Sequence, residues 1–297
     1  MDVLPQQFIN GIVLGSSYAI IAVGYALVFG CLRVVNLSHG DTGMMGAFIG
    51  LLCTHYFDSN IFLAIFTAAA AAGVLGWIIE RVAIRPLGQV SDSTEASHFA
   101  VIITTVGVSI FLQNLALKVF GGYPQPFPSL IPHLTYNFGP IHLTSVQVTV
   151  FIGATILMVG LHLLVNWTKL GMAIRATAEN PESAAMVGIN IKSIQSLTMA
   201  LASALGGAAS VLCCMLFGNI SPFIGTQLGF KGLVALIVGG VGNIVGALLC
   251  GLSLGIIETL SAGYISSSFR DGIAFLLLTL VLILKPSGLL GVNIHKR

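Results

Sequence analysis

Long apolar stretches with almost no charged residues constrain this chain more than any other feature of its sequence. A helix hydrogen-bonds its own backbone inside a bilayer, and about 20 apolar residues are enough to cross the hydrocarbon core. We expect about eight membrane-spanning segments, at residues 8–30, 42–56, 61–79, 99–120, 144–165, 196–217, 230–260 and 272–284. The sequence therefore predicts an all-α fold, a single bundle of transmembrane helices over residues 1–297.

The surface of such a chain must be mostly apolar. Hydrophobic residues make up 56% of the sequence, and Asp, Glu, Lys and Arg together make up only 7%, against about 25% charged residues in an average soluble domain. So few charges cannot cover a water-facing surface, and lipid is the expected surrounding. The formal net charge of +2 and the lack of long Lys or Arg runs argue against nucleic acid as a partner.

The apolar stretch at 230–260 is too long for one ordinary span and contains a break signal. Gly239, Gly240, Gly242 and Asn243 follow one another closely, and Gly weakens a helix interior. We expect two half-helices or two short spans, a broken or re-entrant pair. Other glycines recur at four-residue spacing, which lets helices pack closely: Gly11 with Gly15, Gly46 with Gly50, Gly242 with Gly246, and Gly251 with Gly255.

Basic residues indicate the orientation of the spans, because Lys and Arg concentrate on cytoplasmic loops. Most of them fall in two internal loops and the C-terminal tail: Arg81, Arg85, Lys169, Arg175, Lys192, Lys285, Lys296 and Arg297. Lys118, Lys231 and Arg270 are the exceptions. The pattern predicts an external N-terminus, a cytoplasmic C-terminus and a cytoplasmic loop at about 166–193. The proline-rich loop at about 121–143 then faces outside, as a lid without regular structure.

Polar residues beside the spans are candidates for a transport path, because a polar group in a bilayer is costly and needs a reason. Asn36, Ser38, His39 and Asp41 lie between two spans with little room for a loop. One interpretation is a polar turn at the cytoplasmic interface, in which Asn36 or Ser38 caps the next helix and Asp41 lies in its first turn. The other is a direct role in the path or its gate.

A second candidate for the path or gate is the break itself, at Gly239, Gly240, Gly242 and Asn243. Glu258 lies late in the same apolar stretch. We expect its carboxylate to reach the membrane interface rather than to relay protons.

The loop at 166–193 has apolar residues at helical spacing between charged flanks. This pattern favours a short amphipathic helix for the groove of a partner protein, with a solvated linker as the alternative. Arg175 and Glu179, one helical turn apart, would pair with each other or with the partner. The candidate contact residues are Arg175, Ala176, Glu179, Ala184, Met186 and Gly188.

Several motifs of common enzyme classes are missing from the sequence. It contains no GxxxxGK[ST] phosphate loop, no HExxH and no CxxC pair. We therefore expect no catalytic site, no metal site and no ATP hydrolysis by this chain alone. The five cysteines lie in or beside apolar stretches and are interpreted as small buried hydrophobic residues.

Motifs along nearly the whole chain resemble the permease subunits of ABC importers for branched-chain amino acids, of the high-affinity leucine-system type. One of them, Asn-Leu-Ser-His-Gly-Asp at 36–41, is similar to Asn-Phe-Ala-His-Gly-Glu of the family. It departs from that pattern at Leu37, Ser38 and Asp41. The other motifs lie at 10–19, 80–86, 175–179 with 188–190, and 239–243 with 246–247.

This resemblance implies a membrane permease without cofactors of its own, in the inner membrane of bacteria. The partners it implies are a second, related permease subunit, two cytoplasmic ATPase subunits that bind ATP and Mg²⁺, and an extracytoplasmic solute-binding protein. It also places the ATPase contact in the 166–193 loop. The expected solute is a branched-chain or other neutral amino acid, with urea or a short amide as the alternative. A stand-alone secondary transporter is the rival of another class, but it would need a buried acid or His chain for ion coupling.

Overall fold

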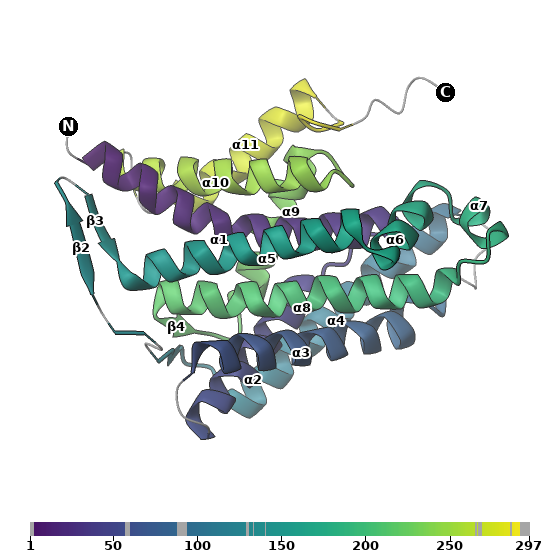
Figure 1. Cartoon of the computed structure of the whole chain (residues 1–297), viewed down its shortest axis with the longest axis horizontal. Helices are drawn as coiled ribbons and strands as arrows, with labels where there is room; N and C mark the ends of the chain where they lie inside the picture. The colour runs from purple at the N-terminus through teal and green to yellow at the C-terminus, as the bar shows by residue number, and fades with distance from the viewer. Residues whose placement is uncertain are drawn as a thin grey trace.

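The computed structural model describes residues 3–56, 60–87, 94–128, 131–132, 134–139, 141–264, 266, 269–285 and 287–291. Long helices lie side by side along the molecule, with the β2–β3 hairpin at one end and α6 and α7 at the other (Figure 1). The elements are α1 (Val3–Leu32), α2 (His39–Tyr56), α3 (Ile61–Ile79), the π-helix η1 (Glu80–Ile84), α4 (Thr94–Phe120), β1 (Gln125–Pro126), β2 (Thr135–Phe138), β3 (Ile141–Thr144), α5 (Ser145–Trp167), α6 (Lys169–Glu179), α7 (Pro181–Met186), α8 (Ile191–Phe217), β4 (Asn219–Ile220), α9 (Ile224–Gly239), α10 (Ile244–Tyr264) and α11 (Arg270–Leu284).

The predicted helical membrane fold is confirmed, with six described helices long and apolar enough to cross a bilayer. These are Leu4–Leu32, Ile61–Ile84, Phe99–Phe120, Ser145–Trp167, Ile191–Phe217 and Ile244–Tyr264. By length and composition, fewer described helices qualify as membrane spans than the expected number of about eight. The physical reason is that α2 opens with the polar residues His39, Asp41 and Thr42, and that α9 and α11 have only 16 and 15 residues.

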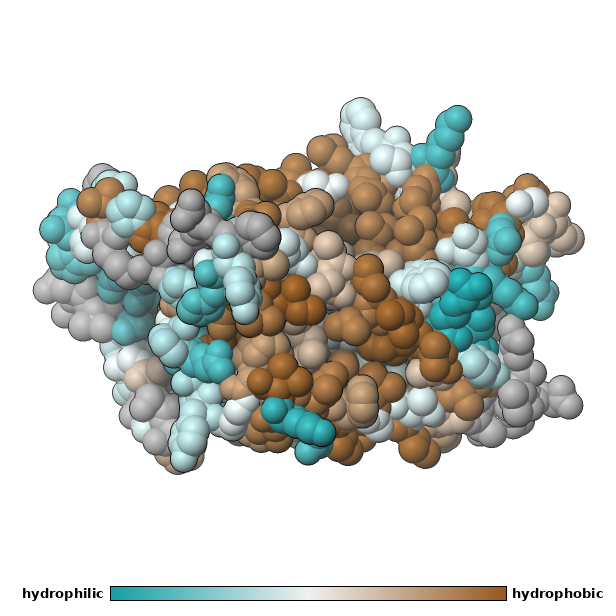
Figure 2. Space-filling view, turned by 90° about the horizontal axis from the view of Figure 1, so that it is seen from below, coloured by the Kyte–Doolittle hydropathy of each residue, from teal (hydrophilic) through white to brown (hydrophobic). Residues whose placement is uncertain are grey.

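The surface has the polarity that lipid requires. Apolar residues dominate the middle of the face drawn in Figure 2, and hydrophilic residues gather mainly toward its two ends. In the apolar windows of α3, α4 and α5 only 22% of residues are buried, whereas 89% are buried in the window of α1. α1 is therefore the central helix, and α3, α4 and α5 present much of their surface outward.

Glycines at the predicted four-residue spacing bring α1 and α10 into close contact. A Cβ atom added at Gly255 would lie 2.3 Å from the backbone of Gly15, and one added at Gly11 would lie 2.6 Å from the backbone of Ile256. Gly46 and Gly50 make the same kind of approach to backbone oxygens of α3. These glycines serve helix packing, as the spacing predicts.

The predicted break in the Gly-rich stretch is present. α9 ends at Gly239 and α10 begins at Ile244, and between them Gly240 and Gly242 have φ angles of +106° and +85°. Only glycine adopts such angles without strain. The Oδ1 atom of Asn243 accepts a hydrogen bond from the Gly246 amide at 3.0 Å, which caps α10. The structure shows two separate helices here.

The expectation that the 121–143 loop lacks regular structure is wrong. Within the described part of the 121–143 loop, β2 and β3 form an antiparallel hairpin in which Thr135 pairs with Thr144. β1 pairs with β4. The prolines mislead because Pro126 lies at the end of the short β1 and Pro132 precedes β2, where neither interrupts a ladder. Pro140 lies outside the described residues.

Candidate translocation path

The chain turns back into the bundle after α1. Arg33 has a φ angle of +56°, unusual for a residue other than glycine. Its guanidinium donates hydrogen bonds to the carbonyl oxygens of Ala178 at 3.3 Å and Glu179 at 3.0 Å. These carbonyls belong to the last turn of α6, where a cation is favoured by the helix dipole. Arg33 therefore ties the end of α1 to the end of α6.

Asn36 and Ser38 form the start of α2. The Oδ1 atom of Asn36 accepts hydrogen bonds from the Ser38 amide at 3.1 Å and from the Ser38 hydroxyl at 2.7 Å. The Ser38 carbonyl in turn accepts from the Thr42 amide at 2.9 Å. These bonds hold the turn that leads into α2, and Asp41 lies in the first turn of α2 as expected.

The side chains of this turn are buried inside the chain. The exposed fractions of Asn36, Ser38 and His39 are 0%, and that of Asp41 is 1%. The reason is that the segment packs inward: the Asn36 amide nitrogen lies 3.7 Å from the sulfur of Met199 in α8. A Cβ atom at Gly206, near the middle of α8, would lie 3.4 Å from the His39 ring.

Asp41 lies among polar side chains of two other helices. Its carboxylate accepts hydrogen bonds from the hydroxyl of Ser109 and the amide of Gln113 in α4, and from the hydroxyl of Thr226 in α9 at 3.3 Å. Gln113 also donates to Thr226 at 2.7 Å. No ion pair to Asp41 occurs among the described residues. We call Asp41, Ser109, Gln113 and Thr226 the Asp41 cluster.

The Asp41 cluster depends on the close approach of α2 and α9. A Cβ atom at Gly40 would lie 2.1 Å from the carbonyl oxygen of Gly225. Both glycines stand at the N-terminal ends of their helices, so two positive dipole ends meet near one carboxylate. A small cavity of about 110 Å³ adjoins the cluster, and its lining includes Tyr25, Val106 and Phe230.

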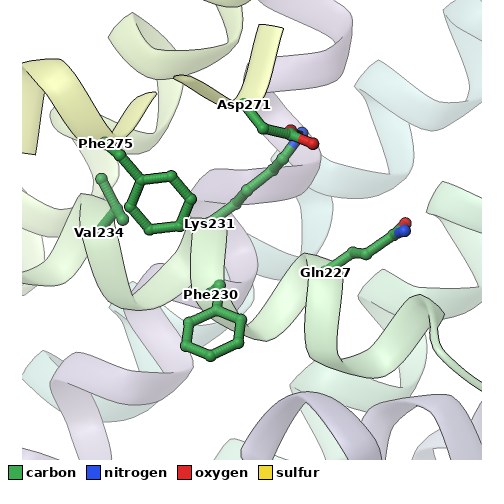
Figure 3. A pocket seen from close by; sticks show the side chains of 6 residues that line it. All are labelled: Gln227, Phe230, Lys231, Val234, Asp271 and Phe275. Atoms are coloured by element: carbon green, nitrogen blue, oxygen red, sulfur yellow. Dashed lines mark ion pairs between the residues drawn. The ribbon is translucent and has the colours of Figure 1, made fainter. Parts of the chain in front are cut away.

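A second polar group, buried on its inner side, surrounds Lys231 of α9. Its ammonium lies 2.6 Å from Oε1 of Glu258 in α10, 3.1 Å from Oδ1 of Asp271 in α11 and 3.1 Å from the hydroxyl of Tyr18 in α1. In Figure 3 the Lys231 side chain extends toward Asp271, with Val234 and Phe275 to one side. We call Tyr18, Lys231, Glu258 and Asp271 the Lys231 cluster.

The Lys231 cluster corrects the interpretation of Glu258. Its side chain is only 1% exposed, so the expectation that the carboxylate reaches the membrane interface is wrong. The reason is the ammonium of Lys231, which compensates a buried carboxylate directly. In the sequence, Lys231 is recognisable only as a basic residue outside the two basic loops and the C-terminal tail.

The break between α9 and α10 lies in a different place from the Asp41 cluster. Gly242 and Asn243 line a cavity of about 890 Å³ together with Arg33, Arg175 and Glu179. Gly239 and Gly240 lie close to other backbone, Gly246 and Gly291 respectively. The residues predicted for the path therefore form two groups, one inside the bundle and one at the α6–α7 end.

The 166–193 loop folds into the predicted helix, in two pieces. Thr168, Asn180 and Asn190 cap the N-termini of α6, α7 and α8 by accepting backbone amides. Gly188, with a φ angle of +88°, forms the turn before α8. α6 buries one face, at Gly171, Ile174 and Thr177, which agrees with an amphipathic helix and not with a solvated linker.

The structure separates the residues proposed for partner contact in this loop. Arg175 donates hydrogen bonds to the Val165 carbonyl at 2.8 Å and to Oδ1 of Asn166 at 2.9 Å; the ion pairs of the described residues do not include a pair with Glu179. Ala184 is 3% exposed and packs inside this chain, whereas Met186 is 80% and Val187 77% exposed. Ala176 is partly buried.

Comparison with known proteins assigns the family. Residues 7–284 match the family described as branched-chain amino acid transport system / permease component. The chain belongs to this family. Among curated proteins it is 35% identical to the high-affinity branched-chain amino acid transport system permease protein LivH of Salmonella typhimurium. It is 36% identical to the corresponding protein BraD of Pseudomonas aeruginosa. Each alignment covers 96% of this chain and 95% of the relative.

The fold of this family member is also similar to a solved structure. The structure is PsaBC from Streptococcus pneumoniae in complex with Fab, with a TM-score of 0.50, 12% sequence identity, and coverage of 94% of this chain and 91% of that chain. At this identity the likeness concerns the fold alone. The chain is thus a multi-pass membrane protein and the permease component of a transport system.

Several residues of the two clusters were not predicted from the sequence of this permease. Ser109 and Gln113 of the Asp41 cluster stand four positions apart within an apolar stretch, and Lys231 stands four positions after Gln227 in another. Such spacing places both members of a pair on one helix face. Polar pairs on one face of a span were therefore a usable signal. Asp271 gave no such signal, because it lies in the first turn of α11 beside Arg270, as many polar residues at helix ends do.

Proposed function

We propose that this chain is the membrane permease subunit of an ATP-driven importer that moves branched-chain amino acids. The observation that carries the proposal is the similarity over nearly the full length to LivH and BraD, whose names state high-affinity branched-chain amino acid transport. The scarcity of charge inside the spans favours a solute without net charge. Buried Asp41 and the partly buried polar side chains around it support passage of a polar solute between apolar helices.

The partners in this proposal are a second, related permease subunit, two cytoplasmic ATPase subunits and an extracytoplasmic binding protein. ATP and Mg²⁺ would bind to the ATPase subunits. Exposed Met186 and Val187 on and after α7 support an ATPase contact there, because apolar side chains outside the membrane favour burial by a partner. Arg175 and Glu179 would lie at the rim of that contact, beside the cavity that they line.

The proposed path has two parts. Asn36, Ser38, His39 and Asp41 form its central part, inside the bundle. Gly239, Gly240, Gly242 and Asn243 form the part nearest the ATPase subunits, where the glycines permit a change of backbone angle. We expect the second part to open and close as the ATPase subunits move.

The proposed topology is a single membrane domain in the bacterial inner membrane, with the N-terminus and the 121–143 loop outside. In this arrangement α2, α9 and α11 add membrane segments to the six long spans. Single cysteines at Asn137 of β2 and Met186 of α7, in a background without the native cysteines, test it with a membrane-impermeant thiol reagent. Asn137→Cys should react only from outside, and Met186→Cys only from the cytoplasm. The reverse labelling would overturn the orientation.

The solute is tested with the complete importer in proteoliposomes, with ATP inside and the binding protein outside. We expect uptake of leucine, isoleucine and valine that depends on ATP and on the binding protein. Omission of the binding protein is the control for leakage. Uptake of urea without uptake of these three amino acids would replace the proposal by the alternative solute.

A further inference from the structure

The cavity beside Lys231 has a lining that combines both signs of charge with apolar side chains (Figure 3). Its volume is about 130 Å³, whereas a single water needs only about 10–15 Å³ on a comparable measure. The cavity therefore has room for more than a few ordered waters. It is lined by Gln227, Phe230, Lys231 and Val234 of α9 and by Asp271 and Phe275 of α11.

The charges in this cavity are arranged asymmetrically. Glu258 holds the ammonium of Lys231 from the buried side at 2.6 Å, and the hydroxyl of Tyr18 adds a contact at 3.1 Å. Asp271 meets the same ammonium at 3.1 Å, but its side chain is 72% exposed. The inner ion pair is therefore enclosed, and the outer one can be exchanged from outside the chain.

The depth of the pair excludes lipid as the neighbour of Asp271. Tyr18 lies about midway along α1, whose 30 residues correspond to a length of about 45 Å. Asp271 lies within two short contacts of that hydroxyl, through Lys231. A carboxylate exposed to hydrocarbon at this depth is strongly unfavourable, so such groups face a bundle interior or a water-filled cavity. The mouth of this cavity consequently faces water or another protein subunit.

We propose that this cavity binds the amino-acid solute as a zwitterion during its passage. The solute carboxylate takes the place of Asp271 on the ammonium of Lys231, and the solute ammonium binds the released carboxylate of Asp271. Every charge keeps a partner of opposite sign in this exchange, which buried charges require. Glu258 and Tyr18 act as positioning residues that hold Lys231.

The apolar part of the lining fits the rest of such a solute. Phe230 and Phe275 are about half exposed, at 50% and 49%, and Val234 lies one turn along α9 from Phe230. Together they offer aromatic and aliphatic contact area within reach of the two charges (Figure 3). Urea and short amides carry no separated charges, and for them the Lys231–Asp271 pair would offer no exchange. The proposal thus rests on the proposed function and specifies the residues that recognise the solute.

The experiment uses the complete importer in proteoliposomes and compares Asp271→Asn with the wild type. We expect leucine uptake to fall about tenfold or more, because a charge-assisted contact to the solute ammonium is lost. Thr279→Val is the matched control, since Thr279 lies on the same helix, is exposed and donates its hydroxyl to the Phe275 carbonyl of that helix. Its uptake should remain within about twofold of the wild type. The yield of assembled complex is measured for each variant.

A second variant keeps the test independent of charge. Phe275→Trp narrows the cavity without changing any ion pair, and we expect leucine uptake to fall more than alanine uptake. Suppose that the wild-type importer takes up leucine and that Asp271→Asn and Phe275→Trp both leave this uptake unchanged. This result would overturn the proposed solute site but would not affect the proposed function. Failure of the wild-type importer to move any branched-chain amino acid would instead overturn the proposed function.

Discussion

The Asp41 cluster and the Lys231 cluster both stabilise charged side chains between apolar helices, but with different partners. Both place charge between apolar helices, and both use α9, through Thr226 and Lys231. Asp41 is held by neutral donors, two hydroxyls and an amide, and by the N-terminal ends of two helices. Lys231 is held by two carboxylates, one enclosed and one exposed. Hydrogen bonds from neutral donors thus hold Asp41, whereas Lys231 lies in a centre of paired charges whose outer partner can be exchanged.

The largest effect expected from this comparison is that of Lys231→Met. The substitution leaves the buried carboxylate of Glu258 without its cation, and breaking a buried ion pair in this way destabilises a protein by about 3–5 kcal/mol. The variant should therefore give little assembled complex. The double variant Lys231→Met with Glu258→Gln should regain most of the yield, measured by size exclusion in detergent. A single variant as stable as the wild type would show that the pair is not needed for folding.

Gly40→Ala should have the next largest effect, because it acts on the junction that brings α9 to Asp41. The new methyl group would lie 2.1 Å from the Gly225 carbonyl oxygen, and overpacking of this kind costs about 1–3 kcal/mol. Gly107→Ala in α4 is the control, since nothing lies within 4 Å of its added Cβ. Thermal unfolding of the two purified variants measures the difference. Equal midpoints would show that α2 and α9 can separate freely.

Asp41→Asn should have a smaller effect, of about 1–2 kcal/mol. The hydroxyls of Ser109 and Thr226 can rotate to accept from the new amide, but the favourable charge at the start of α2 is lost. A loss as large as that of Lys231→Met would contradict the distinction between the two clusters. Asp41→Glu keeps the charge and the side chain usual in the family, and its stability should remain closer to the wild type.

Arg175→Glu should change the stability of the chain least. An exposed charged side chain contributes under about 1 kcal/mol, although here two hydrogen bonds to the end of α5 are also lost. We expect intact folding but weaker retention of the ATPase subunits in a pull-down, together with reduced uptake, because the charge at the proposed rim is reversed. The bulky variant Ala176→Trp should have the same consequence.

Lys169→Glu, a charge reversal at the start of the same helix, is the control for Arg175→Glu. Normal assembly and uptake in both Arg175→Glu and Ala176→Trp would place the ATPase contact elsewhere. The segment 81–97, which begins within η1, is then the next candidate, and its residues 88–93 lie outside the described residues.

Local rules of sequence were sufficient for the helices and for several of their ends. Apolar length predicted the long spans, and the run of Gly239, Gly240 and Gly242 predicted the break, because both depend on the chain's own backbone. The position of Asp41 in the first turn of α2 likewise follows from local sequence. The hairpin of β2 and β3 was missed because its strands are short and lie among prolines.

These local rules could not predict contacts between segments that are distant in the sequence. Glu258 and Lys231 are 27 positions apart, and Asp41 and Thr226 are 185 apart. Nothing in the local pattern around Asn36 distinguishes a turn at the interface from one inside the bundle, since both need the same cap. What separates them is the inward packing against α8, at Met199 and Gly206.

The contact of Arg33 with the last carbonyls of α6 connects the proposed ATPase contact to the start of α2. Arg33 stands only eight positions before Asp41 in the chain, and its guanidinium holds the end of the helix proposed to meet the ATPase. A displacement of α6 therefore pulls on the short segment that leads to the start of α2. By linkage, any coupling between a shift at the start of α2 and the proposed ATPase contact has the same free energy in both directions. Binding of solute in the membrane part would thus change the affinity between this permease and the ATPase subunits outside the membrane.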